Sequence, residues 1–432
     1  MKCFAFKSAL LSLLLIVSAS AALADDARDA FRAGVVKTIP QETLFLHVYY
    51  DKKGGSILQF GDDRLLNLHG AQLSVSMDGG RTWQEPQPLV DSAGSTIGGS
   101  GSSLMLLKSG DLGCVFMRKI GSGRPGVYTV WFSRSNDEGK TWSKPTRVSE
   151  VGIDGIVMHD SAIVTSRGRI VVPAYSWVGQ SAGGCGGLVP EGAGKCVALV
   201  GDDYQHIGGH DYENVMDHSW VYFSDDEGKT WQRNTDGSMI VTLDYGARGH
   251  YSCEESAVAE VSPGHLLLIH RTPLGRFFQS WSSDDGTTWS QPEPSALASA
   301  RAPACLKRIP GTNDLLIVWN QASAEEIRMG FHRNRLSAAI SQDGGLTWKY
   351  HKNVRTREGD RTTRVEPPPI QNYRTRRLAN KRQDAYRPYS SYPALGFWKD
   401  RVIITFYAPA PASPPGQKGI CMSLPLSWFY GN

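Results

Sequence analysis

Side chains able to do acid–base, nucleophilic or anion-binding chemistry are concentrated in three apolar, strand-like stretches of this chain. Two of them read EESAVAEVSPGHLLLIHR, which ends at Arg271, and YPALGFWKDRVIITFY, which begins at Tyr392; the third, RNRLSAAISQDGGLTW, begins at Arg333. A phenol has a pKa of about 10, so it is a good nucleophile at neutral pH only when a carboxylate takes its proton. A guanidinium holds a carboxylate through two parallel N–H bonds. These residue types can act together only if the fold brings the three stretches into contact.

A turn motif that repeats five times sets the framework for these stretches. S-x-D-x-G-x-T-W occurs as SMDGGRTW, SNDEGKTW, SDDEGKTW, SSDDGTTW and SQDGGLTW, with its tryptophan at 83, 142, 231, 289 and 348. The steps of 59, 89, 58 and 59 residues indicate one supersecondary unit with a period near 59. We call this motif the Asp box. Its aspartate accepts hydrogen bonds from the N–H groups of the turn, its glycine adopts a backbone conformation that other residues resist, and its tryptophan packs on neighbouring strands. The motif is therefore structural.

The segments between Asp boxes repeat one order of elements: a strand, a tight turn and a second apolar strand, as in LMLLKSGDLGCVF. Four-stranded sheets at this period are typical of a β-propeller, whose closed ring of blades removes exposed sheet edges. We therefore predict an all-β fold, a single six-bladed β-propeller with Asp-box turns over residues 25–432. The first segment, 41–83, is expected to close the ring with the C-terminal strand near GICMSLPLS. A two-domain sandwich protein is the alternative architecture.

The N-terminal residues 1–24 have the layout of a secretory signal peptide: two lysines, the apolar run ALLSLLLIVSA, and small residues ending in A-L-A. The run is too short to span a bilayer, and no later segment approaches the roughly 18 apolar residues that a span needs. We therefore expect a secreted protein, extracellular or periplasmic, without a membrane span. Without this segment the formal charge falls from +4 to +2, which gives no reason to expect a nucleic-acid partner.

Cysteine and histidine spacing gives weaker signals. Cys185 and Cys196 flank the glycine-rich run GGLVPEGAGK and suit a disulfide that closes a loop of roughly ten residues. The long step between the second and third Asp boxes contains four residues of types that bind metals: His206, His210, Asp211 and His218. His-x3-His in a glycine-rich loop without a predicted helix is a weak metal signature, so a polar rim over a binding face is favoured and no metal or cofactor is predicted.

Asp boxes on the strands of a propeller resemble the sialidase (neuraminidase) superfamily, and the resemblance covers nearly all of the chain after residue 24. Many proteins that are not enzymes share the box, so it supports the fold alone. EESAVAEVSPGHLLLIHR is similar to the family pattern E-x-x-V-x-E-L-x-D-G-x-L-x-x-x-x-R, with Glu255, Val258, Glu260 and Arg271 in register. The resemblance implies that Glu255 polarises a tyrosine nucleophile and that Arg271 is one of three arginines that bind the substrate carboxylate.

The other two stretches carry further matches to the family. YPALGFWKDRVIITFY resembles Y-S-x-L-x-x-L-x-D-G-x-I-x-x-L-Y, which makes Tyr392 the candidate nucleophile, with Tyr389 as the alternative. RNRLSAAISQDGGLTW is similar to R-x-x-L-x-x-x-[LI]-S and makes Arg333 the candidate second carboxylate-binding arginine, with Arg335 as its competitor. Tyr392 then needs Glu255 within hydrogen-bond reach. A neutral nucleophile suits an anomeric carbon that bears a carboxylate, because it avoids like-charge repulsion.

Two positions of the family pattern are missing. The family's first blade usually opens with Arg-Ile-Pro and later carries an aspartate that acts as general acid. Here GGSGSSLMLLKSGDLGCVF places Ser100 about where the arginine belongs, and the loop after it has no acid. Because hydrolysis needs a proton for the leaving oxygen, Asp160 is the expected substitute acid, followed by His159 and then Asp51. The candidates to replace the arginine are Arg118 and Arg124.

Together these features predict a secreted exo-glycoside hydrolase of sialidase type, acting on the terminal acidic sugar of a glycan, either sialic acid or a related acid. One alternative is a catalytically silent glycan-binding propeller that keeps part of the pocket. The other is a polysaccharide lyase on the same fold. The arginine-rich run between Trp348 and Tyr392 is expected to be a solvated loop, with room for a role in gripping an anionic glycan.

Overall fold

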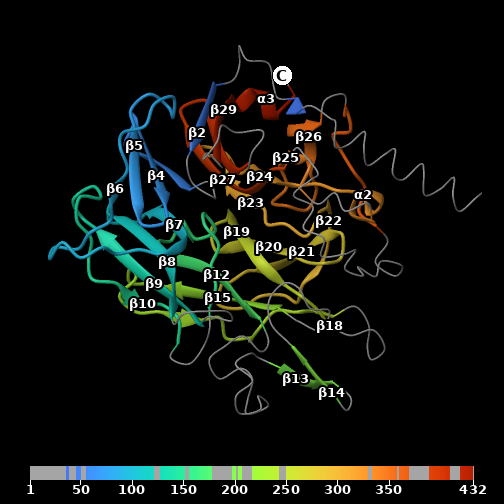
Figure 1. The fold of residues 1–432 in the computed structure, drawn as a ribbon, viewed down its shortest axis with the longest axis horizontal. Helices are drawn as coiled ribbons and strands as arrows, with labels where there is room; N and C mark the ends of the chain where they lie inside the picture. Colours follow the sequence, from blue (N-terminus) through green and yellow to red (C-terminus); the bar gives the residue numbers. More distant parts are fainter. Residues whose placement is uncertain are drawn as a thin grey trace, which may run out of the picture.

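The protein is a ring of six antiparallel sheets, seen in a computed structural model (Figure 1). The predicted all-β, six-bladed β-propeller is confirmed. The structure describes residues 36–37, 45–49, 55–120, 127–150, 155–177, 197–200, 203–206, 217–242, 250–328, 333–357, 360–368, 389–408 and 419–431.

Each blade is an antiparallel sheet of at least four strands. Blade 1 consists of β3 (Ser56–Phe60), β4 (Arg64–His69), β5 (Gln72–Ser76) and β6 (Gln87–Pro88). Blade 2 consists of β7 (Ser100–Leu106), β8 (Leu112–Ile120), β9 (Val127–Ser135) and β10 (Thr146–Arg147). Blade 3 consists of β11 (Ile163–Val164), β12 (Ile170–Trp177), β15 (Asp217–Ser224) and β16 (Gln232–Arg233).

The second half of the ring follows the same plan. Blade 4 consists of β19 (Glu254–Ser262), β20 (His265–Arg271), β21 (Arg276–Ser282) and β22 (Glu293–Ala298). Blade 5 consists of β23 (Cys305–Arg308), β24 (Leu315–Asn320), β25 (Leu336–Ser341) and β26 (Lys349–Arg357), with β1 (Val36–Lys37) added at its edge. Blade 6 consists of β27 (Ser391–Trp398), β28 (Arg401–Tyr407), β29 (Gly419–Pro425) and β2 (Phe45–Tyr49).

Smaller elements decorate this ring. Two hairpins pair β13 (Val197–Val200) with β14 (Asp203–His206), and β17 (Val241–Thr242) with β18 (His250–Tyr251). Two short helices, α2 (Ala324–Arg328) and α3 (Leu426–Phe429), are attached to blades 5 and 6. Among the residues that the structure describes, no helix is long and apolar enough to cross a membrane.

The ring closes in blade 6, where β2 pairs with β29 and places Phe45 opposite Ser423. The segment 41–83 does more than close the ring, because its residues from Ser56 onward form β3, β4 and β5 of a separate blade. The prediction that the first blade opens near Ser100 is therefore wrong by one sheet. The error arises because β3 and β4 are short strands joined by a tight turn, which a single sequence does not distinguish from one ring-closing strand.

Asp boxes lie at the turn that follows the third strand of five blades. In blade 4, the Ser282 hydroxyl accepts the Gly286 N–H at 2.8 Å, and Asp284 accepts the Thr288 N–H at 2.9 Å and its hydroxyl at 2.6 Å. The Trp289 indole donates to the Gly286 carbonyl at 3.0 Å. Glycine is required at this turn because Gly286 has a φ of 91°.

The core lies between adjacent blades, where apolar side chains of neighbouring sheets interdigitate. One cluster between blades 5 and 6 includes Val318, Leu336, Ile404, Phe406 and Met422. The innermost strands also contact one another around the axis, since β3 packs against β7 and β27, and β23 packs against β19 and β27. Residues at the heads of these strands therefore lie near one another although they are far apart in the sequence.

The Asp-box carboxylates should make stability depend on acid pH. Although burial opposes the charged form, hydrogen bonds from Thr141 and Ser135 lower the pKa of Asp137 from 3.8 to about 2. A folded-state pKa below the unfolded one gives stability that is present above the unfolded pKa and lost as pH falls through the folded one. We expect Asp137→Asn to flatten the fall in unfolding free energy between pH about 4 and about 2, measured by urea unfolding. The exposed Asp62→Asn is the control, and an acid limb identical in wild type and Asp137→Asn would contradict this expectation.

Candidate active site

Four innermost strands begin with the same backbone distortion. At the heads of β7, β11, β19 and β27 one residue takes a left-handed conformation: Gly101 (φ 62°), Asp160 (φ 56°), Glu255 (φ 43°) and Tyr392 (φ 54°). In β7, β19 and β27 the pairing with the next strand of the sheet is interrupted at this residue and resumes two residues later, in a shifted register. Such a bulge re-aims one side chain, and non-glycine residues hold it only when their surroundings enforce it. The three predicted catalytic residues therefore occupy one equivalent position in three different blades.

The acidic part of the site is a buried ion-pair cluster at the ends of β19 and β20. The Arg271 guanidinium pairs with the Glu255 carboxylate through Nη1, and its Nε lies 3.4 Å from Oε1 of Glu254. All three side chains are buried. Burial opposes the charge of Arg271, but Glu254, Glu255 and Tyr392 raise its pKa above the ordinary value. Glu255, Arg271 and Tyr392 thus share one electrostatic environment.

Arg333 joins the same cluster from the segment before β25. Its Cζ lies 5.0 Å from the ring centroid of Tyr392 and 5.9 Å from that of Tyr389. Burial lowers the pKa of Arg333, but Tyr389 and Tyr392 outweigh it and raise that pKa above its ordinary value. The positive charge of Arg271 lowers the pKa of Arg333, and the Glu255 carboxylate raises it. The fold therefore brings together Glu255, Arg271, Arg333 and Tyr392 from blades 4, 5 and 6.

Arg335, the competitor of Arg333, lies elsewhere. Its Nη2 contacts Oε1 of Glu326 at 2.7 Å and Oδ2 of Asp360 at 2.8 Å. Adjacent residues on an extended chain point to opposite sides, and residues two apart do so only when the backbone between them bends. Here the chain bends before β25, so Arg333 faces Tyr392 while Arg335 forms ion pairs on the outer side.

Asp160 is brought to the propeller axis but into a different set of contacts. Its Oδ1 accepts hydrogen bonds from Ser56 Oγ at 2.7 Å and Lys307 Nζ at 2.8 Å. Its Oδ2 accepts the Leu395 N–H at 2.9 Å and the Cys305 thiol at 3.4 Å. Every partner is a donor, and the side chain is only 3% exposed. This arrangement suits an anion that ties blade 3 to blades 1, 5 and 6, whereas a general acid has to release a proton to substrate.

His159, the next candidate acid, lies beside the nucleophile candidate. Its Nε2 is 3.1 Å from the carbonyl oxygen of Tyr392, and the two ring centroids are 5.9 Å apart. Its Nδ1 is buried. These contacts let His159 hold the backbone of Tyr392.

The missing arginine is not restored by the predicted substitutes that the structure describes. Arg118 donates to the Gly98 carbonyl at 3.2 Å and stacks over Phe116. Asp51 and Arg124 lie outside the described residues.

Because β3 opens blade 1, the family's Arg-Ile-Pro position falls at the head of β3, where Ser56 binds Asp160. The short hairpin that joins β4 to β5 carries no acid either.

Arg301 is a site residue that sequence reasoning missed. Its Nε contacts Oε1 of Glu254 at 2.8 Å, and its Nη2 contacts Oδ2 of Asp217 at 3.2 Å. The two carboxylates are fully buried, whereas the Arg301 side chain is 25% exposed. Burial and the neighbouring Glu254 raise the pKa of Asp217 well above its ordinary value. Arg301 thereby holds Glu254 against Arg271. A signal was present, because Arg301-Ala302-Pro303 repeats the Arg-x-Pro layout in blade 5.

Tyr175 in β12 is a second residue that the sequence did not single out. It is buried and packs with Ile156 and Met158 in a cluster that Tyr392 also contacts. Burial, followed by Glu255 and Glu254, raises the pKa of Tyr175 well above its ordinary value. Its phenol therefore stays protonated close to the candidate nucleophile and its base.

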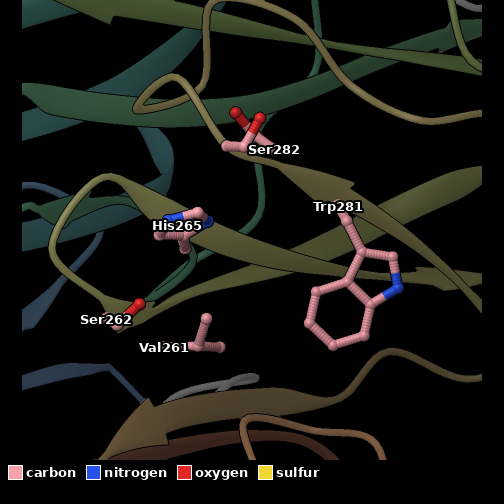
Figure 2. A pocket seen from close by; sticks show the side chains of 6 residues that line it. Val261, Ser262, His265, Trp281 and Ser282 are labelled. Carbon is pink, nitrogen blue, oxygen red and sulfur yellow. The ribbon is translucent and has the colours of Figure 1, made fainter.

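A separate hollow of about 390 Å³ lies at the other end of blade 4 (Figure 2). It is lined by Val261, Ser262, His265, Trp281, Ser282 and Ser283. These residues stand where β19 and β21 end and β20 begins, whereas Glu255 and Arg271 stand at the opposite ends of β19 and β20. The hollow is therefore distinct from the site.

His218 and four described cysteines lie outside this cluster. His218 lies 3.0 Å from the Ser238 hydroxyl, and burial followed by Arg233 lowers its pKa to about 4. His210 and Asp211 lie outside the described residues, as do Cys185 and Cys196. Within the described ranges no three His, Cys, Asp or Glu side chains gather as metal ligands would. Four other cysteines are buried thiols: Cys114, Cys253, Cys305 and Cys421.

The fold and this cluster of arginines, carboxylates and tyrosines define a propeller of the sialidase type. A model of the BNR repeat-like domain matches residues 73–404, and the chain belongs to this repeat family within the sialidase superfamily.

Known proteins of related sequence and fold include sialidases. A sialidase of Bacteroides fragilis (strain YCH46) is 26% identical over 365 residues, which cover 78% of this chain and 57% of that protein. Human Sialidase-4 is 26% identical over 186 residues, which cover 41% of this chain and 32% of that protein. The chain thus spans little more than half of the first relative and a third of the second.

Two solved structures share the fold. A Hadza microbial sialidase has a TM-score of 0.54 at 16% identity, over 88% of this chain and 66% of that one. A protein of unknown function from Dyadobacter fermentans has a TM-score of 0.56 at 15% identity, over 90% of this chain and 99% of that one. At such identities the likeness concerns the fold alone.

Removing the Asp160 carboxylate should destabilise the propeller. Asp160→Asn leaves Lys307 without its buried partner, and breaking a buried ion pair from one side costs on the order of 3 kcal/mol. We expect urea unfolding to show a loss of about that size. The control is Asp225→Asn, which breaks an exposed ion pair with Arg169 and should cost less than about 1 kcal/mol. An Asp160→Asn protein as stable as the control would contradict the structural role.

Proposed function

We propose that this chain is a sialidase-type exo-glycoside hydrolase that releases a terminal acidic sugar from a glycan. The observation that carries the proposal is the joint placement of Glu255, Arg271, Arg333 and Tyr392, which come from three blades and have no sequence proximity. Relatives that carry the name sialidase support the same class of activity. The signal-peptide layout of residues 1–24 supports export, which we propose with it.

The proposed mechanism begins with the substrate carboxylate. Arg271 and Arg333 present guanidinium groups that bind it through paired N–H bonds. The phenol oxygen of Tyr392 attacks the anomeric carbon as Glu255 takes its proton, and the glycosidic oxygen leaves and takes a proton from solvent. Water then attacks the anomeric carbon and loses a proton to solvent, while the tyrosine oxygen leaves and recovers its proton from Glu255. Arg271, which pairs with Glu255, holds this carboxylate in position for the exchange.

The balance of charge in the cluster also favours an anionic ligand. Arg271 and Arg301 pair with the carboxylates of Glu254, Glu255 and Asp217, whereas the described hydrogen-bond partners of Arg333 are the neutral hydroxyls of Tyr389 and Ser391. Arg333 therefore brings a positive charge that no described carboxylate contacts directly. A guanidinium in this setting favours an acidic sugar over a neutral one.

Two alternatives remain from different classes. A catalytically silent glycan-binding propeller is favoured by the commitment of Asp160 and His159 to structural contacts. It is opposed by the strained backbone at both Glu255 and Tyr392, because binding alone does not require this pair. A polysaccharide lyase would use a tyrosine to move a proton and would form an unsaturated sugar.

Replacing the nucleophile should abolish turnover. Tyr392→Phe removes only the phenol oxygen, so we expect release of acidic sugar from a panel of sialosides and uronosides to fall by at least about 10³-fold while binding persists. Matched release by wild type and Tyr392→Phe would sink the assignment. Lack of release by wild type from every substrate would favour the silent binder, and products that absorb in the ultraviolet would favour the lyase.

Activity should depend strongly on the leaving group. Asp160 and His159 are engaged in contacts within the protein, and a general acid is typically worth about 10² to 10⁴ in rate. We expect 4-methylumbelliferyl glycosides, whose phenolate leaves without protonation, to be cleaved at least about 10²-fold faster than alkyl glycosides of the same sugar. Similar rates for the two leaving groups would show that an efficient acid is present.

A further inference from the structure

Two tyrosines, three residues apart, flank one arginine. Arg333 donates from Nη1 to the Tyr389 hydroxyl at 3.1 Å and to the Ser391 hydroxyl. Its Cζ also lies over the rings of both Tyr389 and Tyr392. A guanidinium has five N–H donors, and these two described bonds use two of them. Arg333 therefore contacts Tyr389 directly and keeps donors for an anion.

The two tyrosines differ in what surrounds them. The pKa of Arg271 is raised by Tyr392 as well as by its carboxylates, and the pKa of Tyr175 also responds to Tyr392. Among the neighbours that raise the pKa of Arg333, Tyr389 has the largest effect and Tyr392 the next. Tyr392 is therefore the phenol near Glu255 and Arg271, whereas Tyr389 is the phenol beside Arg333. This division favours Tyr392 as nucleophile and leaves Tyr389 with another task.

The Tyr389 phenol is held rigidly by its neighbours. Its ring meets that of Tyr407 edge to face, with centroids 5.8 Å apart. Nη1 of the buried Arg355 lies 3.3 Å from the Tyr389 carbonyl oxygen and 3.1 Å from the Ser390 hydroxyl. Asn320 Nδ2 donates to the Ser390 carbonyl at 2.8 Å. Burial of Arg355 lowers its pKa to about 10, so holding this segment costs desolvation of a cation.

We propose that Tyr389 donates its hydroxyl proton to the substrate carboxylate and so takes the place of the family's missing arginine. This inference rests on the proposed function. The Tyr389 oxygen accepts a hydrogen bond from Arg333, which leaves its own O–H to donate. Because Nη1 of Arg333 already donates to Tyr389 and Ser391, a substrate carboxylate would bind Nη2 or Nε, and an oxygen on the neighbouring Nη2 can come within hydrogen-bond reach of the Tyr389 hydroxyl. The carboxylate then has two cations and one neutral donor.

A neutral donor has a chemical consequence for the substrate. It stabilises a carboxylate less than a third guanidinium does, so binding relies less on charge and more on the position of one oxygen. The pocket should therefore accept acidic sugars in which the carboxylate is present but the rest of the sugar varies.

The test compares a charged ligand with its neutral counterpart. Calorimetric titration uses the 2,3-unsaturated analogue of N-acetylneuraminic acid and its methyl ester, with wild type, Tyr389→Phe and Tyr430→Phe. Tyr430→Phe is a matched control, because it loses a phenolic hydrogen bond to Asp314 outside the site. We expect Tyr389→Phe to weaken the acid by about 10-fold and leave the ester within twofold. Tyr430→Phe should bind both ligands as wild type does.

Turnover separates this role from nucleophilic catalysis. At saturating 4-methylumbelliferyl substrate, Tyr389→Phe should keep kcat within about threefold of wild type while KM rises, whereas Tyr392→Phe loses turnover. Equal affinity of wild type and Tyr389→Phe for the acid would overturn the Tyr389 role alone, as would a loss of kcat as complete as that of Tyr392→Phe. Wild type that binds neither ligand and releases no sugar would overturn the proposed function together with it.

Discussion

The buried carboxylate of Asp160 is the contact on which the arrangement of the site depends. It stands at the head of the innermost strand of blade 3 and accepts donors from β3, β23 and β27. Because these donors come from three other blades, this single anion fixes the positions of four blades relative to one another. The bond to the Leu395 N–H is the one that matters most for function, because Leu395 follows Tyr392 in the same strand.

Strain and restraint are combined in the segment that carries the candidate nucleophile. A left-handed conformation costs a non-glycine residue on the order of 1 to 2 kcal/mol, and both Tyr392 and Glu255 adopt it. The cost is offset by bonds on either side: Asn320 and Arg355 hold Ser390, and His159 reaches the Tyr392 carbonyl. A phenol held in this way loses little freedom when substrate binds, which is the usual benefit of a preorganised site.

Electrostatic pairing explains why so many charges can be buried at one end of the ring. Each guanidinium meets a carboxylate or a phenol: Arg271 meets Glu255, Arg301 meets Glu254, and Arg333 meets Tyr389. Such clusters stabilise the fold little, because desolvation cancels most of the attraction. Their persistence in this fold is better explained by ligand binding than by stability. The described hydrogen-bond partners of Arg333 are neutral hydroxyls, which agrees with the proposed binding of an anion, whereas the contacts of Asp160 indicate a structural role for that carboxylate.

Periodicity made the architecture predictable. The Asp boxes recur at a nearly regular step, and their serine, aspartate and glycine close each turn through local hydrogen bonds, so five of the six blades follow from counting the boxes. Glu255, Arg271, Arg333 and Tyr392 were predictable because each lies in a motif with its own register. Arg301 was not, since its partners Glu254 and Asp217 are 47 and 84 positions away in the chain. The blade that begins at β3 was misread for a related reason: short strands carry little periodic signal.

What the sequence by itself determined is therefore local: turns, strands, their number, and the residue types at the head of each innermost strand. Tertiary structure decided how those heads are used. Gly101, Asp160, Glu255 and Tyr392 share one backbone geometry, yet only packing around the axis assigns them different tasks. A side chain at Gly101 would meet the Val157 carbonyl at 2.1 Å, Asp160 meets Lys307, and Glu255 meets Arg271. The physical reason is that a charge acquires its role from the partners within a few ångströms, and closure of the ring supplies those partners.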